Sequence, residues 1–154
     1  MNANKIISYI VSSVASVFEI SYTPIFLEGE IPDPLTMSTT DNEKEFELRL
    51  TEFNFNTFTK NNHGVTFDID MLVKMRLSLT SPYEIKAVLG QLVSTFSDVF
   101  TIKRYGEEVD DDETVIGCLN LLTPIEAVDL GQVDDTVNLV FGRVTANYRL
   151  DWSE

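Results

Sequence analysis

The chain has 154 residues, of which 44% are hydrophobic and 23% charged, and this composition predicts one soluble globular domain over residues 1–154. Its formal net charge of −14, from 25 acidic and 11 basic residues, disfavours both sequence-independent binding of nucleic acid and attachment to anionic membranes. The single cysteine, Cys118, excludes an intrachain disulfide framework and favours a reducing, cytoplasmic compartment.

Residues 3–18 place apolar side chains at helical spacing, which predicts an amphipathic helix that covers a sheet. Ser12, Ser13 and Ser16 are expected on the far side of this helix. The segment is too short to span a bilayer and too polar for a signal peptide. Residues 20–27 read as a short strand at an edge or with a bulge, because Pro24 cannot donate a hydrogen bond to a neighbouring strand.

Residues 28–45 form a long irregular segment, and a connection of this length is often functional or flexible. Pro32 and Pro34 favour extended backbone, which suits a strap lying on a neighbouring surface. A plain surface loop is the alternative, and the sequence leaves both open.

A long antiparallel hairpin is predicted over residues 46–79. The apolar positions alternate along residues 46–59 but change phase between Leu50 and Phe53, which indicates a β-bulge. Residues 60–64 contain Asn and Gly and favour a turn, so His63 is expected to be a loop residue at the tip.

The second strand of the hairpin, residues 65–79, is apolar at every odd position and polar at nearly every even one. An extended strand of this length would measure about 45–50 Å, more than the roughly 35–40 Å width of such a domain. We therefore expect the strand either to bend or to project beyond its own core. The half nearest the turn, residues 65–71, is the part expected to leave the domain, whereas residues 73–79 are expected to be core.

This geometry makes the strand and the strap a candidate oligomer interface. The residues assigned to it are Val65, Phe67, Asp68, Ile69, Asp70, Met71, Lys74, Arg76, Ile31, Pro32 and Pro34. The charged members share the polar face of the strand, where alternating charges usually form cross-strand pairs within one sheet. In an oligomer they could also pair between subunits.

Ser81, Pro82 and Glu84 match the start of a capped helix that extends to residue 97. A strand over 99–105, an acidic hairpin loop over 106–113 and a strand over 114–122 are expected to follow. A short connection through Gly131 then leads to a last strand, residues 136–152, which could pair with residues 65–79. The predicted fold class is α+β: a mostly antiparallel sheet with a long hairpin at 46–79, packed by two helices at 3–18 and 82–97.

Motifs for catalysis, phosphate binding and zinc binding are not evident, so neither an enzyme nor a cofactor or metal site is predicted. Cys118 lies in an apolar run and is expected to be buried. The acidic loop is assigned to face solvent or a lumen, and could attract a hard cation, although it lacks the spacing of a calcium loop. It comprises Glu107, Glu108, Asp110, Asp111, Asp112 and Glu113.

The order of these elements resembles the tail terminator, or tail-completion, proteins of tailed bacteriophages. The resemblance is carried by the N-terminal helix, the alternating run Val65-Thr66-Phe67-Asp68-Ile69-Asp70-Met71-Leu72-Val73, the helix at 81–97 and the final strand at 137–150. It implies a homohexameric ring in the virion neck that caps the tail tube and joins it to the head, with DNA passing through the lumen. An acidic lining would then let the duplex pass without sticking, and the partners would be further copies of the chain and neighbouring tail-tube or neck proteins.

Other functions remain open from the sequence. The chain could be a different neck or baseplate subunit of a virion. It could instead be a non-viral cytoplasmic α+β module, either with a ligand-binding or enzymatic cleft beside the second helix or with an acidic surface for a basic partner.

Overall fold

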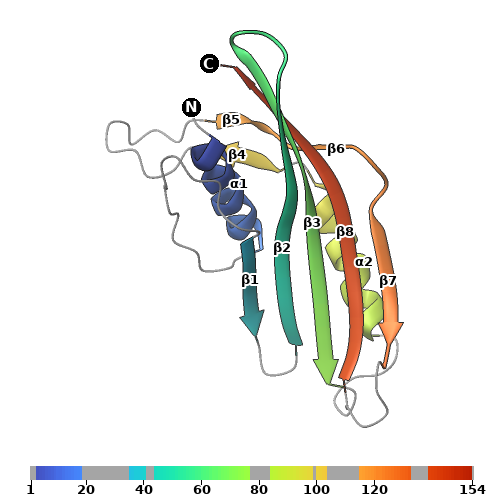
Figure 1. Ribbon diagram of the computed structural model, residues 1–154. Coiled ribbons are helices and arrows are strands. Elements are labelled where there is room, and N and C mark those ends of the chain that lie inside the picture. The colour runs from blue at the N-terminus through green and yellow to red at the C-terminus, as the bar shows by residue number, and fades with distance from the viewer. Residues whose placement is uncertain are drawn as a thin grey trace.

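The computed structural model describes residues 3–18, 35–40, 44–76, 84–98, 100–103, 115–132 and 139–153 (Figure 1). Its helices and strands are α1 (Ala3–Val17), β1 (Leu35–Thr40), β2 (Lys44–Thr57), β3 (Asn62–Arg76), α2 (Glu84–Ser97), β4 (Thr101–Lys103), β5 (Val115–Cys118), β6 (Asn120–Leu121), β7 (Glu126–Gly131) and β8 (Leu139–Ser153).

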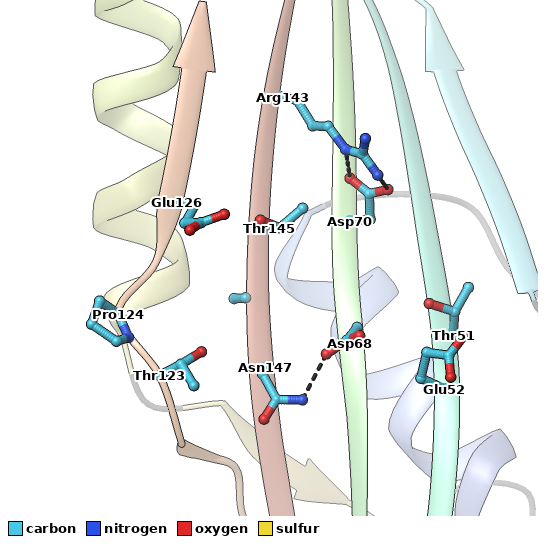
Figure 2. Close-up of a pocket in the computed structure, with 11 residues that line it drawn as sticks. Thr51, Glu52, Asp68, Asp70, Thr123, Pro124, Glu126, Arg143, Thr145 and Asn147 are labelled. Atoms are coloured by element: carbon cyan, nitrogen blue, oxygen red, sulfur yellow. Dashed lines mark hydrogen bonds and ion pairs between the residues drawn. The ribbon is translucent and has the colours of Figure 1, made fainter.

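The main sheet has the order β1-β2-β3-β8, and both β6 and β7 pair with the far side of β8. All its neighbouring strands are antiparallel, and β4 and β5 form a separate two-stranded ribbon. Both helices lie on one side of the main sheet (Figures 1 and 2). The predicted α+β class, with a long hairpin packed by two helices, is confirmed.

The hairpin of β2 and β3 carries the bulge that the sequence predicts. Thr51 pairs with Asp68 and Asn54 with Thr66, so β2 has one more residue than β3 between these pairs. Glu52 lies in the bulge with a φ of 59°. The extra residue changes which side chains face the helices, and this lets both Leu50 and Phe55 turn toward the apolar face.

The apolar face of β3 is core along its described length, and the expectation that its first half leaves the domain is wrong. Val65, Phe67, Ile69 and Met71 are at most 1% exposed within the single chain. The reason is β8, which pairs with β3 over all 15 of its residues, from Asn62 to Arg76. These four apolar side chains are therefore not available to a neighbouring subunit, whereas the polar side chains of the same strand are.

Helix α1 is buried more completely than its amphipathic pattern predicts. Ser12 and Ser13, expected on an exposed side, are only 8% and 3% exposed. The Ser12 hydroxyl donates to the Ser8 carbonyl oxygen at 2.8 Å, and the Lys103 backbone N–H donates to Ser13 Oγ at 3.1 Å. The strand β4 thus packs on the side of α1 that was expected to face solvent.

Helix α2 packs the face that the sequence predicts, since Ile85, Val88, Leu89, Leu92 and Phe96 are all buried. Its last turn is fixed to the sheet by Tyr148 of β8, whose hydroxyl donates to the Phe96 carbonyl oxygen at 2.6 Å. The predicted cap at Ser81 and Pro82 lies outside the described residues.

Three segments differ from their predicted structure. The strap at 28–45 contains the strand β1 and the start of β2, so only part of it could be irregular. The predicted strand at 114–122 is divided at buried Leu119 into β5, which pairs with β4, and β6, which pairs with β8. The connection through Gly131 contains the strand β7, which extends the main sheet.

Two single residues also differ from expectation. Cys118 is exposed rather than buried, because it lies on the two-stranded ribbon and not in the main core. His63 is already part of β3, and its ring stacks on Trp152 of β8 with centroids 5.5 Å apart. The turn of the hairpin is therefore earlier in the chain than predicted.

Candidate functional site

The side of the main sheet opposite the two helices carries polar side chains from four strands, and we call it the open face (Figure 2). It is formed by the alternate residues of β2, β3, β8 and β7 that the core does not use. Its polar members include Arg49, Thr51, Asp68, Asp70, Arg143, Thr145, Asn147 and Glu126.

Asp70 and Arg143 form an ion pair at the centre of the open face. The Arg143 Nε donates to Asp70 Oδ1 at 2.8 Å and its Nη2 donates to Asp70 Oδ2 at 2.6 Å, which is a bidentate geometry. The hydrogen bonds to Asp70, and then its negative charge, raise the pKa of Arg143 above its usual value. The two residues lie on neighbouring strands, so the pair joins β3 to β8.

Asp68 lies one step along the same face from Asp70 and has a neutral partner. Asn147 Nδ2 donates to Asp68 Oδ1 at 2.6 Å and to the Phe67 carbonyl oxygen at 3.2 Å. Because an amide carries no charge, this contact orients the Asp68 carboxylate without neutralising it. The negative charge of Asp68 therefore contributes to the electrostatic potential of the open face.

A shallow hollow of about 570 Å³ lies over these two pairs (Figure 2). Four carboxylates line it, those of Glu52, Asp68, Asp70 and Glu126, against the one guanidinium of Arg143. The remaining lining is formed by threonines, Pro124, Ala146 and Asn147. This excess of carboxylates favours cations and disfavours phosphates at the surface.

The open face becomes more apolar toward β7. A smaller hollow of about 260 Å³ is lined by Leu72 and Leu130 together with Glu47, Arg49, Asp70 and Arg143. Val128, which pairs with Arg143, is 49% exposed, and Leu130 is 46% exposed. Two leucines in and after β6, Leu121 and Leu122, are 42% and 47% exposed. Val128 and Leu130 of β7 thus present exposed apolar side chains on the open face, beside the acidic hollow.

The charged residues that the sequence assigned to an interface do lie on the open face of β3. Asp70 pairs with Arg143, and Lys74 Nζ lies 3.6 Å from Glu45 Oε1 of β2. Both pairs are cross-strand contacts within one sheet, as alternating charges on a strand predict. Arg76 ends β3 and is exposed. Ile31, Pro32, Pro34 and the acidic loop at 106–113 lie outside the described residues.

Sequence reasoning missed the residues of β8 and β7 that complete the open face, chiefly Arg143, Asn147 and Glu126. The signal for the first two was present: Arg143, Thr145 and Asn147 are the polar alternates of the final strand. Assigning them to the same site requires the register of β8 against β3, and that register joins residues 73 apart in the chain.

Two further properties concern the described residues. In the ranges that the structure covers, no three His, Cys, Asp or Glu side chains come together in a way that could hold a metal ion. No described helix is long and apolar enough to cross a membrane.

Comparison with known proteins gives no relative for this chain: no family model matches it, and neither a curated protein nor a solved structure does.

Proposed function

We propose that the chain is a structural virion protein of a phage tail or neck. It forms a homohexameric ring that terminates the tail tube and joins it to the head, and DNA passes through the lumen of the ring. The observation that carries this proposal is the open face, a broad sheet surface that no described helix covers and whose central hollow holds four carboxylates against one guanidinium.

The charge of the open face suits a surface along which DNA must slide. A protein that holds DNA does so by neutralising phosphates with Lys and Arg, whereas carboxylates repel them. Salt screens this repulsion beyond a distance of roughly 8 Å at physiological ionic strength, so it acts only close to the wall of a channel. Such a wall keeps the duplex near the axis without binding it, and the net charge of −14 works in the same direction.

Assembly is the property that tests this proposal first. The purified full-length protein at micromolar concentration is measured by mass photometry and imaged by negative-stain electron microscopy. We expect ring-shaped particles whose mass is six times that of the 17.4 kDa chain, either alone or at the ends of added tail tubes. A strictly monomeric protein that does not attach to tail tubes contradicts the proposal.

A different neck or baseplate position is the nearest alternative, and the same images distinguish it. A tail terminator is expected at the head-proximal end of the tube. Rings that bind only the opposite end, or that bind isolated heads but not tubes, indicate another position in the particle.

The acidic hollow favours one function of another class, a module that binds a basic protein partner. Asp68 is paired with a neutral amide, that of Asn147, rather than with a cation, so the hollow could accept a Lys or Arg side chain. A monomeric protein that binds an oligolysine peptide tightly, with an affinity that falls steeply with salt, would support this function. Weak binding by an assembled ring would support the tail protein.

A further inference from the structure

The two outer strands of the main sheet differ in chemistry, and this difference indicates how one copy would meet the next. Among the described residues, β7 pairs only with β8, and β1 pairs only with β2. Each of these outer strands therefore has one edge of backbone N–H and C=O groups facing away from the sheet. Each is also six residues long, so the edges match in length.

The edge at β7 is only partly protected against pairing with another chain, by two acidic residues and by the register shift between Asp129 and Gly131. Natural edge strands are commonly blunted by Lys or Pro, and the sequence Glu-Ala-Val-Asp-Leu-Gly of β7 contains neither. Two apolar residues of the strand itself, Val128 and Leu130, are nearly half exposed. Covering these two apolar side chains on assembly is favourable. An exposed apolar strand edge of this kind is a template for strand addition.

Charge selects β1 of a second copy as the partner of β7. Pairing β7 with another β7 would bring two copies of Glu126 and Asp129 together, in a protein whose net charge is already −14. Like charges on directly paired strands are destabilising. The strand β1, with the sequence Leu-Thr-Met-Ser-Thr-Thr, carries no charge and is rich in threonine, a residue that favours strands.

The number of strands then sets the relative direction of β7 and β1 where two copies meet. Along β1-β2-β3-β8-β7 every neighbouring pair is antiparallel, so the first and fifth strands run in the same direction, as the arrows of β1 and β7 do in Figure 1. Rotation of a copy about an axis along the strands preserves this direction. When β7 of one copy meets β1 of the next in a ring, the two strands must therefore be parallel.

We propose that adjacent copies join through a parallel pairing of β7 with β1 of the next copy. The joint rests on the proposed ring, and it makes the sheets of all copies one continuous wall. Five strands occupy roughly 24 Å of arc, so six copies would close a circle of about 45 Å in diameter, wider than a DNA duplex. The contact is head-to-tail, and such contacts generate rings when the rotation closes.

Cysteine cross-linking tests the direction of this joint. Each variant carries Cys118→Ser together with Thr36→Cys or Thr40→Cys in β1 and Glu126→Cys or Leu130→Cys in β7. The register places Thr36 opposite Arg49 and Thr40 opposite Glu45 of β2, whereas Glu126 and Leu130 line the open face. Positions four residues apart in a strand are about 13 Å apart, and a bismaleimide shorter than this distinguishes them.

A parallel joint predicts ladders of linked chains for the pairs 36/126 and 40/130, at least about tenfold stronger than for 36/130 and 40/126. The single-cysteine variants are the controls and should give no ladder beyond a dimer. An antiparallel joint reverses the two sets, and this result, or rings without any ladder, overturns the inference while the ring proposal stands. Absence of rings from the unsubstituted protein overturns the proposed function and the joint together.

Discussion

Tyr148 is a buried residue whose hydroxyl links the sheet to the last turn of α2. It is 1% exposed, and burial raises the pKa of this phenol well above its ordinary value. The folded state therefore favours the neutral form, and the hydroxyl donates to the Phe96 carbonyl oxygen. In the unfolded chain the same group ionises near pH 10. Its contribution to stability is complete below that pH and is lost as the pH rises above it.

The substitution Tyr148→Phe tests this pH dependence. We expect the variant to be less stable than the unsubstituted protein by about 1–2 kcal/mol at neutral pH, because the Phe96 carbonyl loses its donor. The difference should shrink between about pH 9 and about pH 11, because ionisation of Tyr148 stabilises the unfolded state of the unsubstituted protein. The Phe variant has no such group, so its stability does not fall for this reason. Urea unfolding at several pH values measures the difference, and a gap that stays constant contradicts the argument.

Glu52 stores strain in the bulge of β2. Its φ of 59° lies in the left-handed region, which costs a residue with a Cβ about 1–2 kcal/mol. We expect Glu52→Gly to stabilise the protein by about 0.5–1 kcal/mol, because relief of strain exceeds the extra entropy that glycine gives the unfolded chain. Glu47→Gly, in a regular part of the same strand, is the control and should destabilise it. The free energies of unfolding in urea decide between these outcomes.

The elements that the sequence predicts best are those whose residues alternate strictly between a buried and a polar side. In β3 and β8 the pattern shows for each residue whether its side chain is apolar or polar, so the strands and the two faces of each strand were predictable. The phase change at Leu50 and Phe53 even located the bulge. What the pattern does not contain is how far the core extends, since that depends on β8 lying beside β3 over its full length.

The strand β7 was missed because it lacks those signals. Its side chains are mostly exposed, and Glu126 and Asp129 are residues that strands usually disfavour.

The candidate site was predictable only in part, because it combines residues from distant parts of the chain. Asp68 and Asp70 followed from the polar face of β3, whereas Arg143 joins them through a pairing between distant parts of the chain.

Substitution of Met71 tests whether the apolar face of β3 belongs to the core rather than to an interface. Met71 is 1% exposed, and Met71→Asp would bury an unpaired carboxylate, so we expect loss of folding. Leu72→Asp is the matched control: Leu72 is only half-buried on the open face, where it lines a hollow with Arg49 and Arg143. We expect it to change stability by no more than about 1 kcal/mol. Circular dichroism and urea unfolding measure both, and a folded Met71→Asp chain that fails to assemble would instead place this residue at an interface.

At the scale of the whole molecule, the main question is where the negative charge is located rather than how large it is. The acidic residues are spread over the chain, but the proposed function depends on those of the open face. Glu52 and Glu126 are exposed and line its hollow, and the contacts of Asp68 and Asp70 do not involve them. They can therefore be changed without breaking the cross-strand pairs that hold β3 to β8.

The double substitution Glu52→Lys/Glu126→Lys is the sharpest test of a DNA-facing surface. It leaves two carboxylates, Asp68 and Asp70, against three cationic side chains in the hollow, which then attracts phosphates. Assembled particles should therefore bind duplex DNA at least about tenfold more tightly at low salt. The affinity should fall steeply as salt is added, as fluorescence anisotropy would measure. The matched control, Glu84→Lys/Asp98→Lys, changes the same net charge at exposed residues of α2 and just after it. If both variants gain DNA affinity equally, total charge governs the effect, and the open face does not line the channel.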